Sequence, residues 1–226
     1  MRFGILGTGI VGRTIASRLA GLGHEVMVGT RNPADTMSRT EPDTYGNPPF
    51  SAWQEEHPEV QLGTFGEASA HGEMVLSATA GAVSLEALEL AGETNLNGKI
   101  LIDIANPLDF SKGMPPTLLV CNTDSLGEQI QRRFPEAKVV KTLHTMNAYL
   151  MVDPAQLAAT DHTAFVSGDD AEAKAMVTEL LRSFGWTDII DLGDITTARG
   201  SEMLLPIWLR LFGALHKPIF NFKIVR

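Results

Sequence analysis

The stretch RFGILGTGIVG, residues 2–12, decides the fold of this 226-residue chain. Residues 2–6 form a mostly apolar run, which predicts a short buried strand. The pattern GxGxxG follows in residues 7–12, and apolar residues then recur at helical spacing through residues 10–20. Residues 25–29, EVMVG, predict a second strand. A strand, a helix and a second strand in this order predict a parallel pair joined by a right-handed crossover.

The glycine pattern between the first strand and the helix predicts a dinucleotide site. Gly7 allows a tight turn, Gly9 lets the backbone approach a pyrophosphate, and Gly12 permits close packing of the helix on the strand. The amides and the partial positive charge at the helix N-terminus then face the phosphates. A structural turn that binds no nucleotide is the alternative. The predicted phosphate loop consists of Gly7, Thr8, Gly9, Ile10, Val11 and Gly12.

The residues after the second strand indicate which nucleotide is bound. An NAD site carries Asp or Glu at this position, where it bonds the adenosine ribose. This chain has Thr30, Arg31 and Asn32 instead. Because a guanidinium suits the 2′-phosphate dianion, we expect NADP(H) as the cofactor. Alternatively, Arg31 is a solvated residue that begins a turn; Arg39 is either a second phosphate contact or solvent-facing, and we expect Arg13 at the surface.

Further strands and helices alternate through the middle of the chain. Apolar runs predict strands at 74–79, 99–104 and 138–143, separated by helical stretches at 84–90 and 124–134. Four prolines, together with Gly46 and Asn47, exclude a regular element through most of residues 41–58. This long loop is either a lid over the site or an insertion without a role in binding.

A new series of strands and helices is expected after Asp153. The expected elements are strands at 163–167, 188–192 and 220–225, a helix capped by Asp169 or Asp170 that runs to Phe184, and a helix at 197–215. We therefore predict an α/β fold, a doubly wound parallel sheet of the Rossmann type. An NADP-binding domain is expected at residues 1–150, with a small C-terminal α/β extension at residues 151–226.

Three later strand ends are candidates for the nicotinamide end of the site, since ligands of such sheets lie beyond the carboxyl ends of the strands. Small residues at the first end let the cofactor pass, and polar groups at the other two can bond a carboxamide or an acceptor carbonyl. His144 is the candidate catalytic residue, although a histidine that merely ends a buried strand is the alternative. The candidates are Ala78, Thr79, Ala80, Asn106, Pro107 and His144.

Charge and cysteine content exclude several classes of function. The net charge of −9 disfavours a nucleic-acid partner. Cys121 is the single cysteine, so no intrachain disulfide or multi-thiolate metal site can form, and a reducing cytoplasm fits. We expect no metal site, no membrane span and no targeting segment. Hydride transfer needs none of the hydrolase or metalloprotease motifs, which this sequence also lacks. The remaining histidines show no metal spacing and are expected in loops or at the surface, namely His24, His57, His71, His162 and His216.

Six segments carry a resemblance that spans most of the chain: GTGIVG (7–12), VGTRNP (28–33), GKILIDIANP (98–107), VVKTLHT (139–145), DLGDITTARGSEMLLPIWLRL (191–211) and FNFKIV (220–225). Together they resemble the NADPH-dependent deazaflavin (coenzyme F420) reductases and the related NADPH domain of STEAP-type metalloreductases. The resemblance implies a Rossmann fold with a small extension, and NADP(H) held by the glycine loop, Thr30 and Arg31. It also implies reversible hydride exchange with a flavin-like ring beside His144.

The chain departs from this family pattern after the strand at 74–79. The deazaflavin reductases carry a proline and a bulky aromatic residue there, whereas this chain has Ala80, Gly81 and Ala82. The small-molecule redox acceptor is therefore deazaflavin coenzyme F420, FMN, FAD or another small electrophile. An NADPH-binding sensor or regulatory protein without turnover is the alternative function, and it would need no space for a planar acceptor.

The C-terminal helix bears on oligomeric state. Its apolar side chains are expected in the core, with a homodimer face as the alternative. They are Trp208, Leu209, Leu211 and Phe212.

Overall fold

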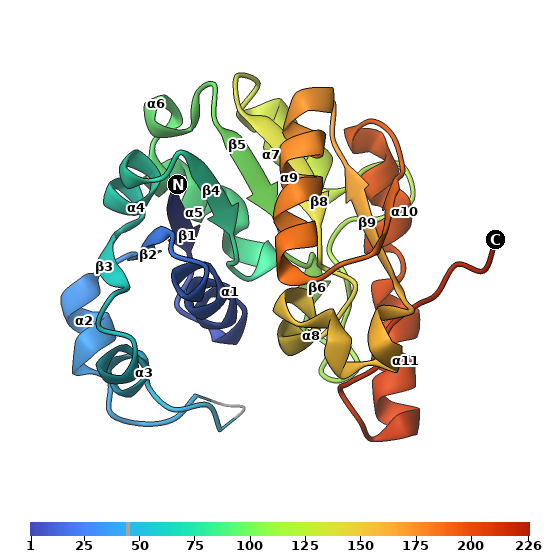
Figure 1. Ribbon diagram of the computed structural model, residues 1–226, viewed down its shortest axis with the longest axis horizontal. Helices are drawn as coiled ribbons and strands as arrows, with labels where there is room; N and C mark the ends of the chain where they lie inside the picture. Colours follow the sequence, from blue (N-terminus) through green and yellow to red (C-terminus); the bar gives the residue numbers. More distant parts are fainter. Residues whose placement is uncertain (44–45) are drawn as a thin grey trace.

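The computed structural model describes residues 1–43 and 46–226 and contains one eight-stranded sheet flanked by helices (Figure 1). The strand order is β10-β9-β8-β5-β4-β1-β2-β3. The six strands from β3 to β8 are parallel and follow the Rossmann order, while β9 runs antiparallel to β8. The strands are β1 (Arg2–Leu6), β2 (Glu25–Thr30), β3 (Gln61–Thr64), β4 (Met74–Ser77), β5 (Ile100–Asp103), β8 (Lys138–Thr142), β9 (Thr163–Ser167) and β10 (Asp188–Asp191).

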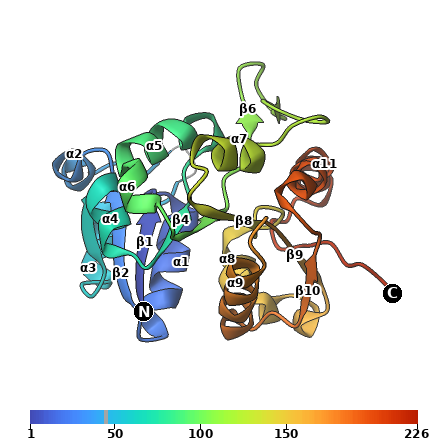
Figure 2. The same cartoon turned by 90° about the horizontal axis from the view of Figure 1, so that it is seen from above.

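Helices cover both faces of this sheet, each over its own apolar core (Figure 2). One core packs α1 (Ile10–Gly21), α8 (Ala148–Val152) and α9 (Ala171–Phe184) on the sheet. The other packs α4 (Phe65–His71), α5 (Ser84–Ala91), α6 (Glu93–Leu96) and α7 (Leu126–Arg133). The remaining helices are α2 (Pro33–Ser38), α3 (Phe50–Glu56), α10 (Ala198–Glu202) and α11 (Leu205–Leu215), with single 3-10 turns η1 (Gly81–Val83), η2 (Pro154–Gln156), η3 (Ala158–Thr160) and η4 (Ile195–Thr197).

The register of the sheet aligns the carboxyl ends of five strands. Leu6 pairs with Gly29 on one side and with Ser77 on the other. Ser77 pairs with Asp103, which in turn pairs with Lys141. The segments that follow these residues therefore leave the sheet at the same edge. A short hairpin of β6 (Leu108–Asp109) and β7 (Thr117–Leu118) projects from this region.

The predicted α/β fold with a doubly wound sheet is confirmed, and the strands predicted from β1 to β10 lie within one or two residues of their expected bounds. Several short elements were not predicted, namely β3, α2, α4, α6, α8, β6 and β7. The strand β3 was missed because QLGT is short and follows the proline-rich segment. The expectation of an irregular loop at 41–58 was wrong in part, since α3 begins directly after Pro49. Thr44 and Tyr45 of that segment lie outside the described residues.

The C-terminal part differs more from expectation. The expected helix at 197–215 is two helices, because Pro206 lies in the first turn of α11, where its missing N–H is tolerated. Residues 220–225 do not form a strand; the carbonyl of Phe222 accepts a bond from the Thr163 amide at 2.9 Å, but no ladder of such bonds develops.

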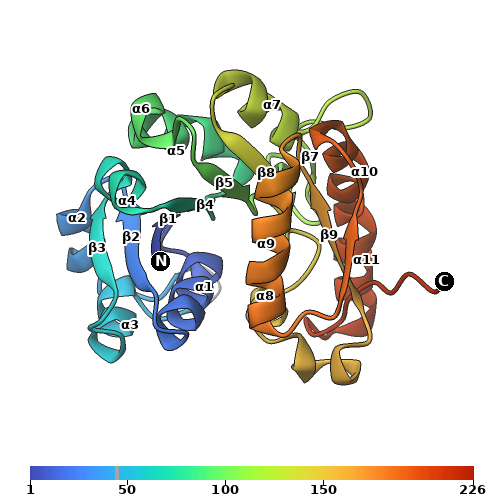
Figure 3. The same ribbon diagram turned by 45° about the horizontal axis from the view of Figure 1, so that its top comes forward.

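The exposed face of α11 corrects a further expectation. Its side chains lie outside both cores, and Phe212 is 40% exposed, while Trp208, Leu209 and Leu211 are half-buried. Figure 3 shows α10 and α11 alongside β9, at the end of the sheet away from β3. Because β9 and β10 continue the sheet that contains β8, the boundary at residue 150 stays a prediction.

Candidate active site

A cleft of about 490 Å³ opens at the aligned carboxyl ends of β1, β2 and β4. It lies at the point where the strand order reverses, between β1 and β4, which is where ligands bind in doubly wound sheets. Most of the residues predicted to hold the cofactor line it. They are Gly7, Thr8, Gly9, Thr30, Arg31, Asn32, Ala78, Thr79 and Ala80.

The glycine loop has the geometry that its sequence predicts. Gly7 has φ of 122°, and a Cβ there would lie 2.7 Å from the carbonyl oxygen of Ala78. A Cβ on Gly12 would lie 2.1 Å from the carbonyl oxygen of Gly7, so only glycine lets the helix pack this close. A Cβ on Gly9 would meet no atom within 4 Å, because Gly9 faces the open cleft. The glycine loop is therefore a close-packed turn that is open to the cleft only at Gly9.

The N-terminus of α1 is available to an anion. Gly9 is the N-cap residue, no side chain caps the helix, and its first turn contains no acidic residue. The helices α4, α7 and α9 are instead capped by Thr64, Ser125 and Asp170. A twelve-residue helix with free N-terminal amides beside a cleft is a suitable site for a phosphate group.

The far end of the cleft carries the basic residues. Arg31 is exposed, and no hydrogen bond or ion pair engages its guanidinium in the part of the chain that the structure describes. Arg39 lines the same cleft. Thr30 Oγ1 lies 2.9 Å from Thr36 Oγ1, and the Asn32 side chain accepts a bond from the Asp35 amide at 3.2 Å, which caps α2. Asn32 therefore holds the helix that carries Arg39.

An apolar wall of the cleft was not predicted from the sequence. Phe65 begins α4, Val83 ends η1, and Ala87 and Leu90 lie along α5. Nothing local in the sequence distinguishes them from core residues, because their exposure depends on how α5 sits against the sheet. These residues, with two acidic side chains at the rim, are Phe65, Val83, Ala87, Leu90, Asp35 and Glu86.

The other predicted residues lie behind or beside the cleft. Ile10 lines a neighbouring groove along α1, and Val11 packs against the core. The carbonyl of Asn106 accepts bonds from the amides of Gly81 at 3.1 Å and Leu108 at 2.8 Å, which places it next to Ala80. Its Oδ1 is buried and has no hydrogen-bond partner among the described residues. Pro107 is buried, and its carbonyl accepts a bond from the Leu119 amide at 2.8 Å.

His144 is buried at the end of β8, with 1% of its surface exposed. Within the described residues neither ring nitrogen has a hydrogen bond of normal geometry. Burial and then the positive charge of Lys141 hold the pKa of His144 well below its usual value, and the carbonyls of Thr142 and Ser201 oppose this only weakly. The imidazole is therefore neutral near pH 7. It does not line the cleft.

Two polar side chains are buried: Arg13 was expected at the surface, and His162, expected in a loop or at the surface, lies in a loop. Arg13 is 8% exposed, and its guanidinium lies over the Phe50 ring, 5.5 Å from the ring centroid. His162 is 2% exposed; its Nε2 lies 2.9 Å from the Pro154 carbonyl oxygen. Both are enclosed by segments distant in sequence, which local polarity does not reveal.

Within residues 1–43 and 46–226, no group of three or more histidine, cysteine or acidic side chains is placed to hold a metal ion. No helix in these ranges combines the length and apolar character needed to cross a bilayer.

Known proteins share both the sequence and this geometry. The model of a family described as "NADP oxidoreductase coenzyme F420-dependent" matches residues 2–107. A crystal structure from Arthrobacter sp. FB24, with the proposed activity of an F420-dependent NADP reductase, is 64% identical and superposes with a TM-score of 0.95. The superposition covers 100% of this chain and 99% of the other. This chain belongs to the F420-dependent NADP oxidoreductase family.

More distant relatives of the family are also similar. The metalloreductase STEAP3 of Rattus norvegicus is 30% identical over 92% of this chain, and the F420-dependent NADP reductase of Methanocaldococcus jannaschii is 31% identical over 51%. The chain spans 38% of the length of the first relative and 52% of the second. The resemblance predicted from the six segments is confirmed, and NADP(H) is the dinucleotide of this family.

Proposed function

We propose that this protein transfers a hydride between NADP(H) and a deazaflavin of the coenzyme F420 type. The observation that carries the proposal is the cleft itself. It joins a glycine cradle and an uncapped helix N-terminus to the Arg31 guanidinium, which has no partner among the described residues, at one end and to the Asn106 segment at the other. Bound NADP(H) supplies or accepts the hydride at its nicotinamide ring.

The residues of the cleft fit the cofactor from end to end. Arg31 and Arg39 bind the 2′-phosphate, with Thr30 beside them. The free edge at Gly9 and the amides of α1 bind the pyrophosphate, for which the open space over Gly9 leaves room. The apolar wall of Phe65, Val83, Ala87 and Leu90 accommodates the adenine ring.

The nicotinamide end is formed by the segments after β4 and β5. Ala78, Thr79 and Ala80 present small side chains along the path of the cofactor. Asn106 adjoins them through Gly81, and its Oδ1, an acceptor with no partner in residues 1–43 and 46–226, would be satisfied by the NH₂ group of a carboxamide. Pro107 fixes the backbone after it. These residues hold and orient the ring.

His144 contributes as a neutral, buried side chain at the adjacent strand end. A neutral imidazole adds no charge beside a ring whose own charge changes during hydride transfer. We propose that it supports the nicotinamide edge from behind, because it lies outside the cleft.

The acceptor has an apolar surface beside this edge. The β6–β7 hairpin lies against η1 and is bonded to Pro107 through Leu119. Phe110 and Leu119 are 49% and 51% exposed. Exposed apolar side chains next to the nicotinamide end suit the docking of a planar ring. The small residues Ala80, Gly81 and Ala82 leave room for it.

The test is oxidation of NADPH by a panel of acceptors. Purified protein is incubated with NADPH and coenzyme F420, FMN, FAD or a ferric chelate, and loss of the nicotinamide absorbance is followed. We expect turnover with F420 that exceeds turnover with the others. Turnover with FMN or FAD but not with F420 would show that the acceptor is a flavin. Measurable NADPH binding without oxidation of any acceptor would instead indicate a sensor.

A further inference from the structure

A fully buried cluster of three charged side chains lies under the nicotinamide end of the cleft. The Lys141 and Asp103 side chains are 0% exposed and that of Glu202 is 2% exposed. Lys141 Nζ donates to Asp103 Oδ2 at 2.8 Å, to Glu202 Oε1 at 3.0 Å and to the Ala105 carbonyl at 2.6 Å. All three of its N–H groups are therefore used.

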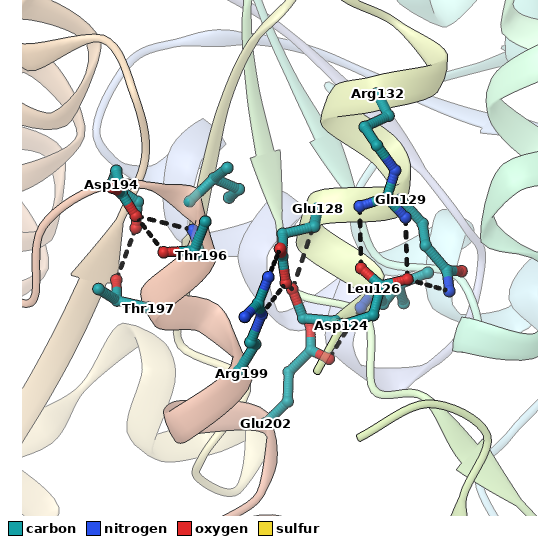
Figure 4. A network of polar contacts seen from close by, with 12 residues as sticks. Asp124, Leu126, Glu128, Gln129, Arg132, Asp194, Thr196, Thr197, Arg199 and Glu202 are labelled. Carbon is teal, nitrogen blue, oxygen red and sulfur yellow. Dashed lines mark hydrogen bonds and ion pairs between the residues drawn. The ribbon is translucent and has the colours of Figure 1, made fainter. Parts of the chain in front are cut away.

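The two carboxylates are also satisfied by backbone amides. Asp103 Oδ1 accepts from the Ala105 amide at 3.0 Å. Glu202 accepts from the amides of Leu126 at 2.9 Å and Gly127 at 3.1 Å, at the start of α7. Figure 4 shows Glu202 facing this turn, beside the pair of Arg199 and Glu128 that also joins α10 to α7. The cluster leaves no group free for a ligand, so its role is to hold parts of the chain together.

The cluster acts on one peptide segment in particular. Ala105 is held at both of its backbone groups, its amide by Asp103 and its carbonyl by Lys141. Asn106 is the next residue, and its carbonyl holds the amide of Gly81. A continuous set of bonds thus runs from Lys141 to the edge of the cofactor cleft at Ala80.

Stability alone does not account for such a cluster. Burying an ion pair costs desolvation that its attraction barely offsets, and apolar residues of similar volume are often at least as stabilising. What the ion cluster adds is a fixed geometry, because Lys141, on β8, holds the Ala105 carbonyl and the carboxylates of Asp103 on β5 and Glu202 on α10 at set distances. Precise placement matters most where a hydride donor and acceptor must meet.

We propose that Lys141 is a positioning residue for the nicotinamide end of the NADP(H) site. It acts through Asp103 and the Ala105 carbonyl to fix the Asn106 peptide, and this inference rests on the proposed function. Through Glu202 it also ties that peptide to α10, so the C-terminal part of the chain takes part in shaping the site.

The test variant is Asp103→Asn, which keeps the shape of the side chain but turns an N–H donor toward the Lys141 ammonium. Three quantities are measured: kcat, the Kd of NADP⁺, and the Kd of adenosine 2′,5′-bisphosphate, which probes only the adenine end. We expect kcat to fall and the Kd of NADP⁺ to rise, each by about tenfold, while the Kd of the bisphosphate changes less than about twofold. Lys141→Met is a second variant with the same expected pattern.

The chain offers a matched control at another strand end. Lys174 Nζ donates to Asp191 Oδ1 at 2.8 Å and to the carbonyl of Gly193 at 2.9 Å, the same lysine–aspartate–carbonyl arrangement outside the cleft. Asp191→Asn should leave all three quantities unchanged. If Asp103→Asn weakened both ligands in proportion to a loss of folded protein, or changed none of the quantities, the inference would be overturned. Should the wild type bind NADP⁺ without turnover, the proposed function fails, while the two Kd values still decide the role of Lys141.

Discussion

Arg13 Nε donates a hydrogen bond to the Thr8 carbonyl at 2.7 Å, so the helix after the glycine loop holds the loop from below. The same guanidinium donates through Nη1 to the Pro48 carbonyl at 2.5 Å. Burial lowers the pKa of Arg13, and the nearby Asp43 carboxylate opposes that shift. One buried side chain therefore connects the phosphate loop to the segment that precedes α3.

Arg13→Ala should weaken both folding and cofactor binding. The substitution leaves the Thr8 and Pro48 carbonyls without their donor and removes the contact with Phe50. We expect the free energy of unfolding to fall by about 2 kcal/mol and the Kd of NADP⁺ to rise. Urea unfolding and calorimetry measure the two effects. Arg182→Ala, at an exposed position, should change stability by less than about 0.5 kcal/mol; equal effects of both substitutions would contradict this role.

The two glycines Gly9 and Gly12 should separate binding from stability. A Cβ on Gly12 would lie 2.1 Å from the Gly7 carbonyl oxygen, so Gly12→Ala should lower the free energy of unfolding by about 3 kcal/mol. A Cβ on Gly9 meets nothing within 4 Å, so Gly9→Ala should leave thermal unfolding unchanged and weaken NADP⁺ by filling the phosphate edge of the cleft. Thermal melts with and without NADP⁺ check both. A Gly9→Ala variant with wild-type affinity would mean that the pyrophosphate lies elsewhere.

Arg31→Ala should change nucleotide selectivity. The guanidinium is exposed at the cleft and unengaged within the described residues, so its removal costs the fold little. We expect the Kd of NADPH to rise by about 30-fold or more and that of NADH by less than about threefold. Fluorescence titration with each nucleotide gives the ratio, and Arg132→Ala, on α7, serves as the control. Equal losses for the two nucleotides would show that the 2′-phosphate is bound by other residues.

His144 should give the protein a pH-dependent stability. Its pKa in the folded state lies well below the ordinary value of 6.5, because burial and then Lys141 oppose its charge. Below about pH 6.5 the unfolded chain takes up a proton that the folded protein does not, so the free energy of unfolding falls as the pH decreases.

The variant His144→Asn removes this contribution. Compared with the wild type, it should lose less stability between about pH 7 and about pH 5 in urea unfolding. Parallel pH dependences in the two proteins would show that His144 is not the group responsible. The pH profile of kcat should likewise show no ionisation of this imidazole near neutrality.

Local sequence predicted the geometry of the glycine loop and of the strand ends beside it well. Residues close together in the chain decide the turn at Gly7, the packing at Gly12 and the position of Arg31. The end of each apolar run decides which residues leave the sheet at its edge. The register then aligned Leu6, Gly29 and Ser77, as parallel pairing requires. The family resemblance rests on six segments between residues 7 and 225.

The C-terminal part was predicted less well for a physical reason. Residues 220–225 have the composition of a strand. Strand pairing, however, requires a free sheet edge in register, and this segment forms only one backbone–backbone hydrogen bond with the described residues, from the Thr163 amide to the Phe222 carbonyl. Trp208 and Phe212 are apolar like core residues, but neither belongs to the two apolar cores, which other helices form with the sheet. Whether the apolar side chains of α11 are buried depends on which other elements pack against them.

By itself the sequence determined the strand–glycine loop–helix unit and the choice of a phosphorylated dinucleotide, because each rests on backbone conformation or charge within a few residues. The family followed from a resemblance carried by six segments along the chain. Only the tertiary structure decided that Arg13 lies beneath the loop, that α5 supplies an apolar wall to the cleft, and that Lys141 meets Asp103 and Glu202 in a buried cluster. Apart from the bond between Arg13 and Thr8, these contacts join residues that are tens of positions apart. Their existence depends on how helices and strands pack in space rather than on the local preference of any one segment.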